Sequence, residues 1–485
     1  MKLVKPRVIV FDDKSRNVLL TALSGKKFEA STSPLLIHVP TSRSATSDVQ
    51  NAISHFAIEE TSDKATHAFT SDSSMFYTDC SKALQDFDIS TGWKNLTKPA
   101  AMFFTSGTTS SSKAVVLTHQ SLLLQSLTKV SVVPYSESTV YLHLAPLFHV
   151  GGASSAFSVT LARGQHIIPE PHCHPSKLVA YIRRYKINTL VVVPAILQKI
   201  VDFIVLSKQK PVDTIEVILS GGGCMTNDLR QNVDEAFGRV RVVETYAMTE
   251  TASSLGFRDV NVWKEPKQSA GYRIAPHVDI GIRSENGKIQ VGRAANGLGE
   301  IVTRGSQVMQ GYWQNEKATR SAFVGSTDDK EAWLATGDLG YIGNDDTLHV
   351  KGRSKDMIKS GGENVFSSEV ESVLTSHPNV RDAAIFGVKH RNFGEAVVGA
   401  VQYNEYVTDM VDAPANLRKW CKCRLSGYKV PRALWQVNEV PKTVTGKTNK
   451  SLLQAILQDD IRRFLQEDYS RSRKRLLRFT WRPKL

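Results

Sequence analysis

Residues 103–119 read FFTSGTTSSSKAVVLTH, and this stretch says more about the fold than any other part of the chain. Small and hydroxylated residues and one lysine follow directly on an apolar run that is typical of a buried strand. Hydroxyls and backbone N–H groups of such a loop can hold phosphate oxygens, and a lysine adds positive charge. The residues expected to contact phosphate are Thr105, Ser106, Gly107, Thr108, Thr109 and Lys113. Taken alone, the stretch fits a Ser/Thr-rich surface turn better, so its meaning depends on the segments that follow.

Five further segments follow in a fixed order. They are LSGGG at 219–223, TYAMTET at 245–251, ATGDLGYI at 335–342, GRSKDMIKSGGENVFSSEVE at 352–371 and VPKTVTGKTNK at 440–450. Together with the first loop they resemble the adenylate-forming acyl-CoA ligase superfamily over most of the chain. The pattern does not favour a P-loop NTPase, because the second glycine of that motif is missing before Lys113. Pro441 also stands where the motif would need its first glycine before Gly446-Lys447-Thr448.

The chain between the first loop and LSGGG alternates between strand and helix patterns, which predicts an α/β fold with a parallel sheet covered by helices. Short strands are expected at 7–12, 34–40, 101–104, 140–144, 189–193 and 214–219, and helices at 120–129, 175–185 and 195–206. The glycine and hydroxyl clusters follow the strands. We therefore expect ligands at the carboxyl ends of the strands.

After residue 352 the pattern changes to that of a small α+β unit. Helices are expected at 367–376 and 414–424, and strands at 380–388, 396–403 and 433–437. The resemblance implies a large N-terminal adenylation domain at 1–351 and a small mobile C-terminal domain at 352–455 with its hinge near Lys355. Residues 456–485 are expected to form a C-terminal helix and basic tail.

The composition fits an enzyme better than a nucleic-acid-binding or disulfide-rich protein. Of the 485 residues 41% are hydrophobic, and no apolar run approaches the roughly 18 residues that cross a bilayer. The five cysteines have no spacing typical of a zinc site or disulfide framework. Half of the net charge of +14 lies in residues 462–485, which hold nine Lys or Arg and two acidic residues. Because no nucleic-acid motif accompanies this tail, we expect no nucleic acid as a partner.

The resemblance implies a role for each matching residue of the nucleotide site. Gly221, Gly222 and Gly223 would lie against adenine, and Tyr246 would stack on it. Thr249 would contact the α-phosphate, and Glu250 would hold Mg²⁺, a cation that prefers carboxylate and phosphate oxygens. Asp338 and Arg353 would bind the ribose hydroxyls. The implied cosubstrates are ATP and CoA, with a small carboxylic acid as the third.

Lys447 is the residue expected to carry catalysis. A lysine that bridges the attacking carboxylate and the α-phosphate neutralises the charge that develops in adenylation. The resemblance also implies that the small domain then rotates and brings a glycine pair, Gly361 and Gly362, to the pantetheine arm of CoA. Glycine suits this position because a thiol arm can pass close to a backbone without side chains.

Residues 140–157, VYLHLAPLFHVGGASSAF, are similar in sequence to the plant-type o-succinylbenzoate CoA ligases. In that interpretation His149 stands at the mouth of the acyl pocket, and Gly152, Ser154 and Ser155 shape a polar pocket for an aromatic keto acid. Taken alone, His149 is as typical of a buried structural histidine. Acids related to 4-coumarate and fatty acids stay open as alternatives.

Several features depart from the family pattern. Ser110, Ser112 and Ala114 stand in a loop that the family fills with glycines and a proline, and fewer residues than usual precede this loop. A shortened N-terminus would hide any transit peptide. The alternative to an active ligase is therefore an impaired protein that binds nucleotide or acyl-CoA. Intact Thr249, Glu250, Asp338, Arg353 and Lys447 favour the ligase.

The last three residues, Pro483, Lys484 and Leu485, are similar to the C-terminal peroxisomal signal Ser-Lys-Leu. A peroxisomal import receptor would then be a partner. The plant resemblance also allows a plastid location, and without either signal the protein would be cytoplasmic. The oligomeric state does not follow from the sequence.

Overall fold

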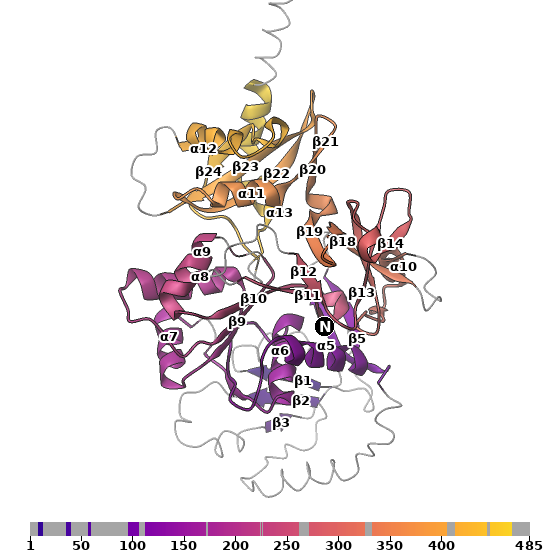
Figure 1. Ribbon diagram of the computed structural model, residues 1–485, viewed down its shortest axis with the longest axis vertical. Coiled ribbons are helices and arrows are strands. Elements are labelled where there is room, and N and C mark those ends of the chain that lie inside the picture. The colour runs from indigo at the N-terminus through magenta and orange to yellow at the C-terminus, as the bar shows by residue number, and fades with distance from the viewer. Residues whose placement is uncertain are drawn as a thin grey trace, which may run out of the picture.

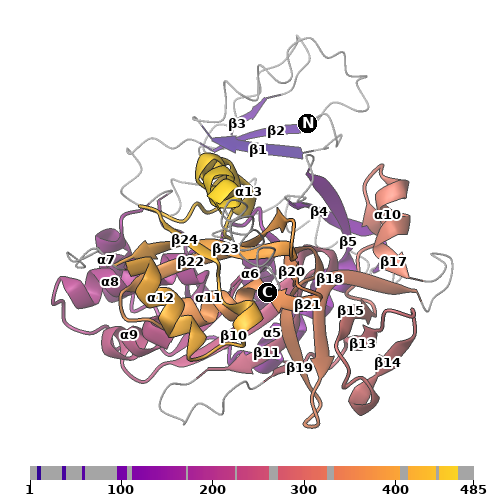
Figure 2. The ribbon, with the colours of Figure 1, turned by 90° about the horizontal axis from the view of Figure 1, so that it is seen from above.

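The computed structural model describes residues 8–12, 35–39, 57–59, 96–105, 112–170, 173–223, 225, 227–260, 271–324, 332–404, 413–443 and 447–467. Within these ranges the strands form four sheets, and the largest, which has 13 strands, dominates the lower part of Figure 1. A second, smaller layered unit lies above it. Figure 2 shows this unit, drawn in orange and yellow, stacked over one side of the large unit.

One half of the large sheet is parallel. Its strands run in the spatial order β10 (Arg241–Met248), β9 (Val217–Gly221), β8 (Thr189–Val192), β6 (Val140–His143) and β7 (Gln165–Ile167). The helices between them are α6 (Val150–Leu161), α7 (Pro175–Arg184), α8 (Pro194–Leu206) and α9 (Asn227–Phe237), and α5 (His119–Val132) precedes β6.

Helices cover both faces of this parallel half. Successive strand residues point to opposite faces, and Leu190 and Val192 accordingly join the apolar cluster under α7, α8 and α9. Val191 points the other way, into the cluster that includes Val133 at the end of α5 and Val159 of α6. In sheets covered on both faces, ligands bind at the carboxyl ends of the strands, here those of β8, β9 and β10.

Beyond β10 the sheet continues with antiparallel strands. In spatial order these are β11 (Ser253–Asp259), β12 (Tyr272–Ile274), β19 (Thr347–Arg353), β18 (Trp333–Ile342), β15 (Gly299–Arg304), β13 (Asp279–Arg283) and β14 (Ile289–Val291), and β17 (Phe323–Val324) also pairs with β18. The short helix α10 (Glu316–Ala322) and the 3-10 turns η2 (Thr249–Thr251) and η3 (Gly292–Ala294) connect these strands.

Two small sheets complete the large unit. In one, β5 (Lys113–Thr118) pairs antiparallel with β4 (Pro99–Thr105) and with β16 (Gly311–Tyr312). The other consists of β1 (Val8–Asp12), β2 (Leu35–Val39) and β3 (Ala57–Glu59). No helix in the described part of the chain is long and apolar enough to cross a membrane.

The smaller unit is built on a five-stranded sheet. It contains β20 (Met357–Ser360), β21 (Glu363–Phe366), β22 (Val380–His390), β23 (Gly394–Tyr403) and β24 (Ala433–Gln436), with α11 (Ser367–Thr375), α12 (Ala413–Lys422) and α13 (Lys450–Ile456). The 3-10 turn η5 (Gly427–Lys429) precedes β24, and η4 (Ser354–Asp356) joins β19 to β20. The chain therefore passes from one sheet to the other at η4, which holds the expected hinge residue Lys355.

The elements expected from the sequence are confirmed, with ends shifted by a few residues. The largest shifts are three residues, at the start of β9, which is Val217 rather than residue 214, and at the end of α5, which is Val132 rather than residue 129. The expected parallel sheet with helices is confirmed for β6–β10. Helices α6 and α9 and the antiparallel half of the sheet were not predicted.

A buried charge network holds the wall of the sheet beside α9. The carboxylate of Glu244 on β10 is 1% exposed, and its Oε1 accepts from the backbone N–H of Met225 at 3.0 Å and from Arg230 at 3.1 Å. Its Oε2 accepts from Arg258 on β11. One carboxylate thus ties α9, β10 and β11 together.

Glu244→Gln is expected to destabilise the protein by on the order of 3–5 kcal/mol, because two part-buried guanidinium groups lose their shared counter-charge. The measurement is urea denaturation. Asp259→Asn is the matched control, since Asp259 pairs with Arg241 in a half-exposed bridge that is worth less than about 1 kcal/mol. Equal losses in the two variants would contradict a structural role for the network.

Candidate active site

Three of the residues expected to bind nucleotide meet at the junction of β10, β18 and β19. The Tyr246 hydroxyl donates to Asp338 Oδ2 at 2.7 Å, and Arg353 Nε lies 3.7 Å from Asp338 Oδ1. Asp338 and Arg353 stand directly opposite each other in the β18–β19 pair. Burial raises the pKa of Asp338, although Tyr246, Arg353 and Lys447 act in the opposite direction. Burial, and next the charge of Asp338, raise the pKa of Tyr246 well above its ordinary value.

The glycine segment lies beside this group. Gly221 ends β9 and pairs with Thr245, the residue before Tyr246. A Cβ on Gly221 would come within 2.9 Å of the Thr245 methyl group, and Gly222 has a φ of +82°, a conformation that favours glycine. Gly223 follows this turn. The turn therefore brings backbone close to Tyr246.

Thr249 and Glu250 form the 3-10 turn η2 that follows β10. The Tyr312 hydroxyl donates to Glu250 Oε1 at 2.9 Å, and the backbone N–H of Met309 donates to the Glu250 carbonyl at 2.8 Å. Lys113 Nζ lies 4.7 Å from the centroid of the Tyr312 ring. The lysine of the first loop and the carboxylate of η2 therefore contact the same tyrosine. Sequence reasoning missed Tyr312, for which no local pattern gives a signal.

The phosphate loop is described only in part. Thr105 ends β4 and pairs with Lys113 at the start of β5. Ser106, Gly107, Thr108, Thr109 and Ser110 lie outside the described residues. Ala114 is 1% exposed and pairs with Phe104 in β5. Ala114 therefore belongs to a buried strand, which needs no positive φ, and not to the loop in which the sequence analysis set it.

Lys447 reaches the large unit from a turn of the small one. The Thr443 N–H donates to the Lys447 carbonyl at 2.7 Å, and the Lys447 N–H donates to Thr443 Oγ1 at 3.2 Å. Partial desolvation lowers the pKa of Lys447, as does Arg353, whereas Asp338 and Glu250 raise it. The ammonium group is therefore close enough to feel both carboxylates.

The segment expected to form the acyl pocket surrounds the start of α6. His149 is the N-cap residue, and its Nδ1 accepts from the Gly151 N–H at 3.2 Å. Burial lowers the pKa of His149, followed by the charges of Lys447 and Lys129. Ser154 and Ser155 are fully buried. Their hydroxyls accept from Lys129 Nζ at 2.6 and 2.9 Å.

Gly152 fills a structural position. A Cβ at this residue would lie 2.3 Å from the carbonyl oxygen of Pro146 and 2.6 Å from that of Ala145. A Cβ on Gly151 would meet only the His149 ring, at 3.4 Å. Gly152 thus allows close backbone packing, and Gly151 is the glycine beside the histidine.

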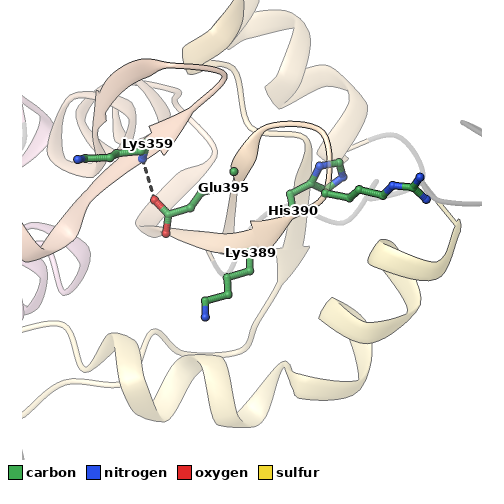
Figure 3. Close-up of a pocket in the computed structure, with 6 residues that line it drawn as sticks. Lys359, Lys389, His390 and Glu395 are labelled. Carbon is green, nitrogen blue, oxygen red and sulfur yellow. Dashed lines mark hydrogen bonds between the residues drawn. The ribbon is translucent and has the colours of Figure 1, made fainter.

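The second expected glycine pair forms the turn between β20 and β21. Gly361 and Gly362 have φ values of +65° and +88°, and the Gly361 N–H donates to the Phe393 carbonyl at 2.8 Å. Next to this turn is an open pocket of about 630 Å³, shown in Figure 3. Its lining is mostly basic and consists of Lys359, Lys389, His390, Arg391, Gly394 and Glu395.

Comparison with known proteins finds matches to both units. Residues 14–313 match the family model for the AMP-binding enzyme, and residues 369–447 match that for the AMP-binding enzyme C-terminal domain. The 2-succinylbenzoate–CoA ligase of Arabidopsis thaliana, named chloroplastic/peroxisomal, is 31% identical over 72% of this chain and 65% of its own length. The peroxisomal butyrate–CoA ligase AAE11 of the same plant is 30% identical, over 73% of this chain and 62% of its own. This chain thus spans less than two thirds of either relative.

A solved structure supports the fold directly. The o-succinylbenzoate–CoA synthetase MenE from Bacillus subtilis, in complex with the acyl-adenylate OSB-AMP, superposes with a TM-score of 0.62 at 28% identity. The match covers 74% of this chain and 69% of that one. The family resemblance and the expected α/β architecture are therefore confirmed.

Gly152→Ala is expected to destabilise the protein by about 1–3 kcal/mol or more, because the added methyl group collides with two backbone carbonyls. Gly151→Ala is the matched control. It should be neutral or slightly stabilising, because alanine is favoured over glycine within a helix. Thermal denaturation of the two variants makes the comparison, and a stable Gly152→Ala protein would contradict the packing role.

Proposed function

This chain belongs to the AMP-binding enzyme family, and from that premise we propose that it joins a carboxylic acid to coenzyme A at the expense of ATP. The acid is first converted to an acyl-adenylate with release of pyrophosphate. The thiol of CoA then attacks the acyl carbon and AMP leaves. The acid that we propose is 2-succinylbenzoate, and the product is 2-succinylbenzoyl-CoA.

The observation that carries the proposal is the approach of Lys447 to Glu250, Asp338 and Arg353. These residues belong to two different units, and their charges reach one another. In the first step an oxygen of the acid attacks the α-phosphorus, and negative charge grows on the phosphate. The Lys447 ammonium group offsets this charge and holds the acid in line. The hydroxyl of Thr249 on η2 would donate a hydrogen bond to an α-phosphate oxygen.

The nucleotide would occupy the carboxyl ends of β9 and β10. Gly221–Gly223 and Tyr246 would hold adenine, and Asp338 and Arg353 the ribose hydroxyls. Thr105, Lys113 and the loop after β4 would bind the β- and γ-phosphates. Mg²⁺ is commonly bound through one or two carboxylates plus substrate phosphates. The Glu250 carboxylate fits that requirement, and the bound ion would neutralise phosphate charge.

CoA would use the other face of the small unit. Its diphosphate and 3′-phosphate are anionic, and Lys359, Lys389 and Arg391 line a pocket next to the Gly361–Gly362 turn. In Figure 1 the tip of the β20–β21 hairpin extends away from the large unit. We infer that the unit turns about the hinge at Lys355 between the two steps, as the domain limits 1–351 and 352–455 would allow.

The identity of the acid rests on the segment 140–157 and on the relatives. The Arabidopsis 2-succinylbenzoate ligase and the Bacillus subtilis synthetase support an aromatic keto acid. A butyrate ligase at 30% identity keeps short fatty acids, and with them acids of the 4-coumarate type, as the second candidate. The names of the plant relatives support a peroxisomal or plastid location, with an import receptor as partner of the Pro483–Leu485 end.

Pyrophosphate release tests the function. The purified protein is given ATP, Mg²⁺ and one acid at a time, with and without CoA. The panel contains 2-succinylbenzoate, 4-coumarate, butyrate and a long-chain fatty acid. Release that depends on 2-succinylbenzoate supports the proposal. No release with any acid, together with retained ATP or acyl-CoA binding, would favour the impaired binding protein instead.

Lys447→Ala is expected to lower the rate of acyl-adenylate formation by on the order of 10² to 10³, because the contact that stabilises the transition state is lost. Thioester formation from a preformed acyl-adenylate should persist, since Lys447 serves only the first step. Single-turnover assays of the two half reactions separate these effects. Equal loss in both would show that Lys447 does not act on adenylation alone.

Lys389→Ala is expected to raise the KM for CoA by about 10-fold, the effect of losing one charge-assisted hydrogen bond to phosphate. Pyrophosphate release without CoA should not change. Lys419→Ala, an exposed lysine on α12, is the control, and dephospho-CoA tests whether the 3′-phosphate is the group bound. An unchanged KM for CoA would remove this pocket from the CoA site.

A further inference from the structure

Lys129 on α5 is a buried lysine whose partners are all uncharged. Its side chain is 1% exposed, and Nζ donates to Ser154 Oγ at 2.6 Å and Ser155 Oγ at 2.9 Å. The third acceptor, the carbonyl oxygen of Gly151, is 3.5 Å away. Within the described part of the chain, no carboxylate forms an ion pair with this ammonium group.

A buried ammonium group without a counter-charge costs free energy, since neutral acceptors replace water only in part. The cost is reflected in the pKa of Lys129, which burial lowers to about 7. An apolar side chain of the same volume would pack between α5 and α6 at lower cost. The packing of the two helices therefore does not explain a lysine at this position.

The position of Lys129 relative to the reacting centre suggests a role. The imidazole of His149 lies close enough to both Lys129 and Lys447 for each to lower its pKa. One ammonium group belongs to the adenylation centre, and the other lies behind the first turn of α6. The two positive charges are thus available to the two ends of one ligand that passes His149.

Unpaired hydroxyls lie beside the same cluster. The Tyr135 side chain is 7% exposed and lies next to Ser155. Tyr141 is fully buried, and burial, followed by the nearby Tyr135, raises its pKa. Neither hydroxyl has a hydrogen-bond partner among the described residues. Buried polar groups are normally paired, so these two hydroxyls point to a polar ligand group that completes the cluster.

We propose that Lys129, with Ser154 and Ser155, selects acids that carry a second carboxylate at the end remote from the reacting one. The proposal rests on the ligase function proposed above and deepens it by naming the substrate class, a dicarboxylic acid. The reacting carboxylate would lie beside Lys447, and the remote one would accept hydrogen bonds from the Lys129 ammonium group directly or through the two serine hydroxyls. Lys129 is then a specificity-determining residue.

The charge balance of this arrangement is favourable. Binding brings the missing counter-charge to a buried ammonium group and forms charge-assisted hydrogen bonds, which are about twice as strong as neutral ones. A monocarboxylic acid of the same shape would leave Lys129 in its present surroundings and gain nothing there. The site would therefore discriminate by a charged contact and not by size.

The test uses a matched pair of acids that differ by one carboxylate: 2-succinylbenzoate and 4-oxo-4-phenylbutanoate, which lacks the carboxylate on the ring. Pyrophosphate release gives kcat/KM for each acid with the wild-type protein and with Lys129→Met, Ser155→Ala and the control Lys199→Met, an exposed lysine on α8. Lys129→Met should lower the preference for the dicarboxylate by 10- to 100-fold, on the order expected for hydrogen bonds to a charged group. Its kcat/KM for the monocarboxylate should stay within about twofold of wild type.

Ser155→Ala should lower the same preference by less, and Lys199→Met should not change it. Thermal denaturation checks the fold, and Lys129→Met should melt at or above the wild-type temperature because an unpaired buried charge is removed. If Lys129→Met fails to fold, the Ser155→Ala preference decides.

The outcomes separate the two proposals. Equal loss with both acids, or no loss with either, would overturn the role of Lys129 while the ligase function stands. A wild-type protein that prefers butyrate or 4-oxo-4-phenylbutanoate to 2-succinylbenzoate would overturn it as well. Absence of pyrophosphate release with every acid would overturn the ligase function, and the role of Lys129 with it.

Discussion

The register of β18 against β19 is the constraint on which the site depends. It sets Asp338 opposite Arg353 and leaves Asp338 within hydrogen-bond distance of Tyr246 on β10. Arg353 is also the last residue of β19, from which η4 leads into the small unit. A shift of one residue would turn these side chains to the other face of the sheet and move the start of the small unit. One strand pair therefore fixes both the nucleotide-binding residues and the place from which Lys447 must reach them.

The two kinds of charge in the large unit differ in how they are compensated. Glu244 is buried with two arginines and a backbone donor, and this network stiffens the wall formed by β10 and β11. Lys129 is buried with neutral oxygens only. Structural charges in protein interiors are paired because an unpaired one is costly. The contrast within one protein is the physical reason to assign Glu244 to the framework and Lys129 to a ligand.

Local signals decided which parts could be predicted from the sequence. Proline begins α7 and α8, and apolar residues repeat at helical spacing behind it, so both helices were correctly predicted. Helix α6 begins Val-Gly-Gly-Ala-Ser-Ser, in which every residue except the alanine has a lower helix propensity, and most of the segment is buried. The motif residues of the site were found because their order along the chain resembles a family. Tyr312 and Lys129 were missed, since their surroundings are set by strands and helices distant in sequence.

One ion pair between the two units offers little resistance to movement of the small one. Among the described residues, Arg381 of β22 pairs with Asp202 of α8 at 3.4 Å, and both side chains keep about a third of their exposure. Such part-exposed pairs contribute about 0–1 kcal/mol to stability. Loss of a partner in a buried network costs far more, on the order of 3–5 kcal/mol. The network that holds the wall which would bind nucleotide is therefore stronger than this ion pair between the units. An enzyme that uses one face of its small domain to form an adenylate and another to receive a thiol needs this difference, because the first face must leave before the second can act.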